Sequence, residues 1–133
     1  MDRPLGVTIL SILNAVGGMI FIFAGLSVFI YGDFYVKMVM SQLPHRMLIS
    51  PYELMLMMKY IAVLSIVGGI LGIVIGFGLW IGATWAWWMY MVILVLNLIS
   101  AILTLPRSVL GLAIILVVMY YMTRPHVREY FNV

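Results

Sequence analysis

The side chains in this chain that could bind a metal are methionines and histidines, because the sequence has no cysteine. Six of its twelve methionines lie in the stretch 38–58 together with His45. Thioether sulfur is a soft ligand that favours Cu(I), and Met55 and Met58 would share one face of a helix. Methionines are also flexible apolar side chains that suit contacts with a partner. We predict no metal site, and keep Met55, Met58 and His45 as weak Cu(I) candidates.

The remaining chemistry of the chain argues against catalysis. His45 and His126 are separated by three expected membrane crossings, so they cannot bind one haem or one metal ion. The sequence offers no Ser-His-Asp set, paired carboxylates or phosphate-binding loop. Apart from Lys59 and Arg107, which lie near segment ends, none of its apolar segments contains Asp, Glu, Lys, Arg or His, the residues on which proton relays and ion-coupled transporters depend. The sequence therefore predicts a protein that is not an enzyme and has no cofactor.

Two amides lie inside apolar segments, Asn14 and Asn97. Counted from Pro4 and Trp85 at ~1.5 Å per residue, both are ~15–18 Å deep in the membrane. A buried amide in lipid needs hydrogen-bonding partners. We expect the two amides to face one another or a common partner. The alternative is a polar lining along which a neutral solute could pass.

Small residues recur on two of the apolar segments. Gly68, Gly72 and Gly76 are spaced four apart, and Gly18 belongs to a small or polar face that also contains Ser11, Asn14 and Gly25. Small side chains allow helix backbones to approach closely, which is how helices associate in lipid. We predict that Gly68, Gly72, Gly76, Asn14, Gly18 and Asn97 are helix-packing residues. The partner could be a helix of the same chain or of a second copy.

The elements that carry these residues are membrane helices. The chain is 66% hydrophobic and 8% charged, with a mean hydropathy of +1.23, well outside globular usage. Residues 60–106 carry no charge, a length that allows two crossings of ~20 residues and a turn. All four tryptophans fall at positions 80–88, where an aromatic belt at the membrane surface is expected.

We predict an all-α, integral membrane four-helix bundle formed by one domain, 1–133, with both termini on the same face. Its crossings are 5–31, 54–80, 85–103 and 106–123, and a Met-rich loop, 32–58, joins the first two. Gly32 should end the first helix, and Asp33 could begin a short helix to about Leu43. Ser50 and Glu53 form a capping-box pattern that should start the second helix at Pro51.

The orientation of this bundle depends on its basic residues. Three lie on the face of the termini and four on the other face (Arg3, Arg124 and Arg128; Lys37, Arg46, Lys59 and Arg107). Because long loops cross the membrane with less regard to charge, we expect the termini in the cytoplasm of a multi-pass cell-membrane protein.

Three short motifs resemble a family. The opening RPLGVTIL (3–10), the middle GLWIG (78–82) followed by WAW (85–87), and the closing YMTRPHV (121–127) resemble an uncharacterised group of small four-helix membrane proteins common in archaea and some bacteria. The resemblance covers most of the chain except the Met-rich loop, and it implies the four-helix topology without assigning an activity. The chain departs from the group at Ala83 and Thr84, where a basic residue is often expected.

These observations predict a non-enzymatic membrane protein that acts through helix–helix contacts. We expect an accessory or structural subunit of a larger membrane complex, or a homo-oligomer, whose partners are the lipid bilayer and other subunits or itself. Nucleic acid is not an expected partner. The alternatives are a small carrier or pore for a neutral solute and, third, a copper-handling role of the Met-rich loop.

Overall fold

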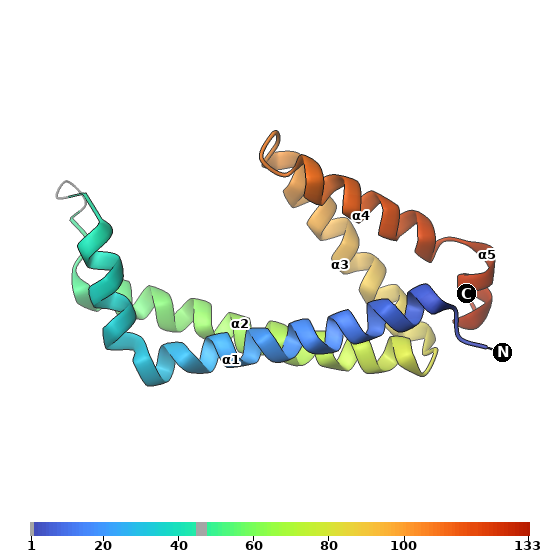
Figure 1. Ribbon diagram of the computed structural model, residues 1–133, viewed down its shortest axis with the longest axis horizontal. Coiled ribbons are helices and arrows are strands. Elements are labelled where there is room, and N and C mark those ends of the chain that lie inside the picture. Colours follow the sequence, from blue (N-terminus) through green and yellow to red (C-terminus); the bar gives the residue numbers. More distant parts are fainter. Residues whose placement is uncertain (1, 45–47) are drawn as a thin grey trace. The chain divides into compact units, whose positions relative to one another are not determined.

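The computed structural model describes residues 2–44 and 48–133, and in these residues the regular structure is entirely helical (Figure 1). The helices are α1 (Leu5–Gln42), α2 (Pro51–Trp80), α3 (Thr84–Leu103), α4 (Val109–Met122) and α5 (Pro125–Tyr130). The chain divides into two compact units. We call Met1–Ala15 with Val74–Val133 the terminal unit, and Val16–Ile73 the hairpin unit.

Three helices, α1, α2 and α3, are long and apolar enough to cross a membrane, which is compatible with a multi-pass membrane protein. Their most apolar windows have mean hydropathies of 2.2, 2.5 and 2.1. Helix α4 is apolar but has 14 residues, or about 21 Å at 1.5 Å per residue, less than the ~30 Å hydrocarbon core. The predicted fourth crossing, 106–123, began too early because Thr104 to Ser108 form a turn.

Helix α2 confirms the predicted second helix at both ends, since it runs unbroken over Pro51–Trp80. Its start is held by the predicted capping box. The backbone N–H of Glu53 donates to the Ser50 hydroxyl at 3.1 Å, and the N–H of Ser50 donates to a Glu53 carboxylate oxygen at 3.3 Å. These two bonds satisfy backbone groups that the first turn of a helix leaves without partners.

The Met-rich loop, 32–58, is largely helical, in agreement with the short helix predicted to about Leu43 and the helix start predicted at Pro51. The predicted break at Gly32 corresponds to a kink at Tyr31, where φ is −115° and ψ is 25°, after which α1 continues to Gln42. The stretch 51–58 is the start of α2. His45 and Met47 lie outside the described residues. A glycine after an apolar run permits a helix stop but does not enforce one, because neighbouring packing decides whether the helix resumes.

The core of the terminal unit consists of large apolar side chains from all its helices. Residues with no exposure to solvent include Val7 from α1, Leu79 from α2 and Ala86 from α3. Met122 from α4 and Phe131 after α5 are equally buried. The C-terminal segment, in which Val127 and Phe131 are buried, is therefore an integral part of this core.

Candidate helix-contact site

Two glycines bring the α1 and α2 backbones into direct contact in the hairpin unit. A methyl group added at Gly18 would collide with the carbonyl oxygen of Gly69, and one added at Gly69 would collide with that of Gly18. A methyl group at Gly25 would lie 2.7 Å from the carbonyl oxygen of Ala62. Only residues without a side chain fit here, so these positions set the distance between the two helices.

The same contact repeats at intervals of seven residues. In the hairpin unit, Gly18 faces Gly69, Gly25 faces Ala62, and Gly32 faces the sulfur of Met55, which would be 3.0 Å from an added methyl group. Within the terminal unit, Gly76 faces the carbonyl oxygen of Ser11, at 2.8 Å from such a methyl group. Each step of seven residues forward in α1 matches a step of seven backward in α2. This is the register of an antiparallel helix pair with a seven-residue repeat.

These contacts correct the predicted glycine stripe. Gly18 and Gly76 lie where α1 and α2 approach closely, but the face of α2 that pairs with α1 contains Gly69 in place of Gly68. A methyl group at Gly68 would meet nothing within 4 Å in the described residues, and Gly72 is half-buried. The prediction used a spacing of four, whereas residues on the α1-facing side of α2 recur every seven, so Gly68 lies on a neighbouring face.

A second, unfilled face lies beside this pair. A groove of about 210 Å³ is lined by Ala24 and Gly25 on one helix and by Ala62 and Ser65 on the other. The Ser65 hydroxyl donates to the backbone carbonyl of Phe21 at 2.8 Å. Gly68 follows Ser65 by three residues and Gly17 precedes Ala24 by seven, so both continue the groove along their helices.

We call this second surface, formed by Gly17, Ala24, Ser65 and Gly68, the open face. A methyl group at Gly17 would, like one at Gly68, find no neighbour within 4 Å in the described residues. The small residues of α1 and α2 therefore form two sets. One set brings the two backbones together, and the other leaves backbone uncovered.

The two amides do not pair with one another, which corrects the prediction for Asn14 and Asn97. The Asn14 side chain donates to the carbonyl of Leu10, and the exposed Asn97 side chain donates to that of Ile93, each at 2.8 Å. An amide in a helix can satisfy itself on the carbonyl four residues earlier. The pairing prediction overlooked this local solution.

The Asn14 side chain also lies near the hydroxyl of Tyr90 on α3. Sequence reasoning missed Tyr90, although it lies seven residues before Asn97 and hence on the same side of α3. Asn14 is thus a packing residue of the terminal unit, whereas the exposed Asn97 is not. The carrier hypothesis loses the facing pair of amides from which it was drawn.

The Cu(I) candidates are not brought to one place in the described residues. Met55 contacts Gly32 and lines one cavity, while Met58 lines the groove with Ala24. Residues 2–44 and 48–133 contain no group of three or more His, Cys, Asp or Glu able to hold a metal ion. His45 lies outside these residues, and the ring of His126 packs edge-on against that of Tyr121.

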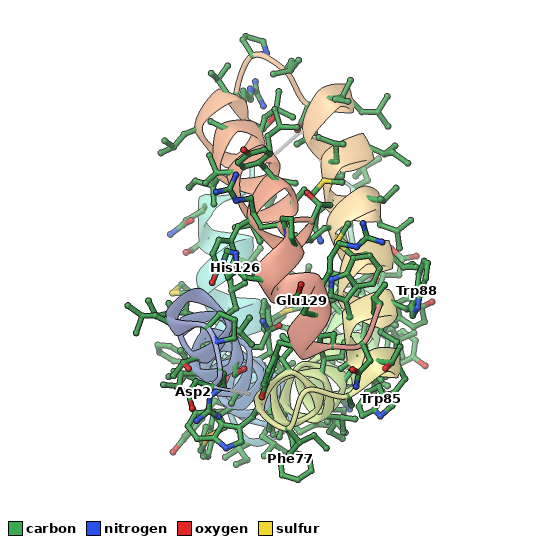
Figure 2. All side chains as sticks on the ribbon, turned by 90° about the vertical axis from the view of Figure 1, so that its right-hand side faces the viewer. Asp2, Phe77, Trp85, Trp88, His126 and Glu129 are labelled. Atoms are coloured by element: carbon green, nitrogen blue, oxygen red, sulfur yellow. The ribbon has the colours of Figure 1, made fainter. Side chains whose placement is uncertain are left out.

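The three motif segments meet in the terminal unit. The Arg3 guanidinium lies 3.5 Å from the centre of the Trp80 ring, and its Nη1 donates to the Trp80 carbonyl at 3.3 Å. The Tyr130 hydroxyl donates to the same carbonyl at 2.7 Å. This carbonyl belongs to the last turn of α2, where helix carbonyls lack intrahelical partners and favour a positive charge. Figure 2 looks onto this end, with His126 and Glu129 on α5.

Further hydrogen bonds stabilise the terminal unit near the end of α2. The Thr84 hydroxyl donates to the Phe131 carbonyl at 2.7 Å, and the indole N–H of the buried Trp87 donates to the Met122 carbonyl at 3.1 Å. Gly82 has a φ of 72°, a conformation that favours glycine. The three motifs that suggested a family thus lie in contact with one another in this chain. Their side chains link both ends of the sequence to the turn between α2 and α3.

Comparisons of the chain with protein-family models, with curated proteins and with solved structures gave no match. The class that the fold defines is accordingly broad: over residues 2–44 and 48–133 the regular structure is helical, and three of these helices are able to cross a membrane. Within that class, the most informative feature is the division of small residues between a closed helix contact and the open face.

Proposed function

We propose that this protein is a non-enzymatic, multi-pass protein of the cell membrane that acts through helix–helix contacts. It serves as an accessory or structural subunit of a larger membrane complex, or it forms a homo-oligomer. One observation carries this proposal. After Gly18, Gly25 and Gly69 have brought α1 and α2 together, Gly17 and Gly68 still leave backbone uncovered beside a groove.

The open face has the composition of a helix-binding surface in lipid. Apolar side chains gain little from leaving lipid for another apolar surface, so helices associate through close packing of small residues and through hydrogen bonds. A glycine inside a helix costs about 1 kcal/mol relative to alanine. In the hairpin unit, no close contact at Gly17 or Gly68 compensates that cost. A helix packed along the open face would provide the contact.

The proposed topology has four crossings with both termini in the cytoplasm. Helix α4 completes the fourth crossing together with the turn that precedes it, since Leu105 in that turn extends its apolar length. The motif resemblance to small four-helix membrane proteins supports the same topology. Cysteines introduced at Ser41 and at Asn132 would test it, because a membrane-impermeant thiol reagent added to intact cells should label the first and spare the second. Labelling of both from one side would reject four crossings.

The contact function is tested by purification from native membranes. The wild-type protein should retain a stoichiometric protein partner or a second copy in mild detergent. Gly68→Leu should lose this association while the purified chain keeps its helical content and thermal stability. Val67→Leu is the matched control because it adds volume to an exposed neighbouring position. A wild-type protein that is monomeric and partner-free in native membranes, as judged by cross-linking before solubilisation, would contradict the proposal.

A further inference from the structure

A small cavity lies in the hairpin unit beside the bend in α1. Its volume is about 140 Å³, and its lining includes Ile30, Gly32, Asp33, Met55 and Lys59. Tyr31, between two of these residues, has non-helical backbone angles. The bend therefore interrupts the regular helix at the wall of the cavity. At a helix kink, backbone carbonyls can tilt away from their helical partners.

The backbone contributes to this lining. Val28, Phe29 and Ile30 all border the cavity, although side chains of three successive helical residues point about 100° apart. They cannot all face one cavity with their side chains, so part of their contact is through main-chain atoms. The cavity is accordingly mostly polar despite its apolar neighbours. It differs in this respect from the apolar groove of the open face.

The cavity contains one side chain of each charge. Asp33 would repel a bare anion, and Lys59 would repel a bare cation, because like charges at close range are unfavourable. A ligand that carries both an ammonium and an anionic group satisfies the two residues together. The pairing of opposite charges in one small polar cavity thus selects for a zwitterion.

The position of the cavity indicates where such a zwitterion comes from. Lys59 is the last charged residue before the uncharged stretch 60–106, and Tyr31 is an exposed aromatic residue at the end of the apolar run of α1. Lysine and tyrosine at these places are typical of the boundary between lipid and water. The cavity therefore lies at the depth of the lipid headgroups if α1 and α2 cross the membrane.

We propose that this cavity binds the headgroup of a phospholipid with a primary amine, such as phosphatidylethanolamine. Asp33 accepts hydrogen bonds from the ammonium group, and Lys59 donates to the phosphate. Backbone carbonyls beside Tyr31 accept the remaining ammonium protons. A trimethylated amine has no N–H to donate and is larger, so the site discriminates against phosphatidylcholine. This inference depends on the membrane location of the chain and is independent of any protein partner.

Native mass spectrometry of the full chain in detergent with mixed lipids tests the site. We expect phosphatidylethanolamine to be retained in preference to phosphatidylcholine and phosphatidylglycerol. Asp33→Asn should abolish the preference over phosphatidylcholine, and Lys59→Gln should weaken retention about two- to fivefold, the range for one exposed ion pair. Lys37→Gln, which removes an exposed charge outside the cavity lining, is the matched control and should change nothing.

Three results would overturn the proposal. Equal retention of the three lipids by the wild-type protein would show that Asp33 and Lys59 serve only to balance each other. Equal effects of Lys37→Gln and Lys59→Gln would show only a general attraction to charged surfaces. Free glycerophosphoethanolamine is the probe for a soluble zwitterion, and competition by it at the concentration of the lipid would reject the membrane lipid as the source.

Discussion

Each of the two units of this protein is stabilised internally, and the two use opposite kinds of packing. The terminal unit buries large side chains such as Phe131, Leu79 and Met122, and its segments exchange hydrogen bonds through Trp80, Trp87 and Thr84. The hairpin unit relies on glycines that permit backbone contact, together with one hydrogen bond from Ser65 to the facing helix. The stability of the terminal unit thus depends on large buried side chains. That of the hairpin unit depends on the lack of side chains where its two helices meet.

This contrast predicts opposite sensitivities to mutation. Removing atoms should damage the terminal unit because it leaves cavities in a packed core. Adding atoms should damage the hairpin unit because the colliding atoms belong to the backbone and cannot move away as a flexible side chain can. Mutations at the two sets of glycines also distinguish packing within the chain from binding to a partner. Atoms added at the glycines of the open face should meet no other atoms of the chain.

The largest effect is expected for Phe131→Ala. This side chain has no exposure to solvent, and truncation of a buried phenylalanine costs ~3–5 kcal/mol. Chemical unfolding in detergent micelles measures the loss. Phe77→Ala is the control in the same unit, because Phe77 is 63% exposed and its truncation should cost little. Similar losses for both variants would break the proposed role of the terminal core.

Gly69→Leu should destabilise the hairpin unit by ~1–3 kcal/mol through overpacking. Its added atoms would meet the carbonyl oxygen of Gly18. Gly68→Leu, one residue away, is the sharpest control because it should leave the stability of the isolated chain unchanged. Thermal unfolding of the purified variants distinguishes them. If Gly68→Leu were the more damaging change, the assignment of the two glycine faces would be reversed.

Arg3→Leu should destabilise the terminal unit by about 1 kcal/mol. It removes the stacking of a cation on Trp80, worth ~0.5–1 kcal/mol at an exposed site, and a hydrogen bond to the end of α2. Arg3→Lys should recover part of this loss because it restores the charge without the planar donor group. Fluorescence of Trp80, in a variant where the other tryptophans are replaced by phenylalanine, reports the change directly. An unchanged emission spectrum would contradict the stacking.

Ser65→Ala should have a smaller effect, ~0.6 kcal/mol, the average for an interhelical hydrogen bond in a membrane protein.

The smallest effect is expected for the coupling between the two amides. Asn14→Leu and Asn97→Leu are expected to act independently in a double-mutant cycle, because each amide donates to its own helix. A coupling above 0.5 kcal/mol, the usual limit of additivity, would restore the facing pair that the sequence suggested.

Local signals in the sequence predicted the helices well. The uncharged stretch, the capping box at Ser50 and the turn near Gly82 are properties of neighbouring residues, and α2 and α3 begin and end close to the predicted positions. The break predicted at Gly32 lies within one residue of the kink at Tyr31. Local pattern could not show that α4 starts at Val109 after a five-residue turn.

The sequence predicted that glycines of α1 and α2 form a packing site, but it did not predict which glycines of α2 face α1. Glycine content showed that α1 and α2 carry packing surfaces, yet a spacing of four and a spacing of seven were both present around Gly76. Only the facing helix decides between them, through the match of Gly18 with Gly69 and of Gly25 with Ala62. The proximity of Asn14 to Tyr90 was equally hidden, since it depends on how α1 and α3 pack against each other.

The central claim, that the open face binds another protein helix, is tested most directly by cross-linking at Gly68. The chain has no cysteine, so Gly68→Cys provides a unique thiol, and Ile70→Cys places the same group on the opposite side of α2. In native membranes, Gly68→Cys should form an intermolecular cross-link with a second copy or with another membrane protein, whereas Ile70→Cys should not. A cross-link formed equally by both variants, or by neither, would contradict the claim.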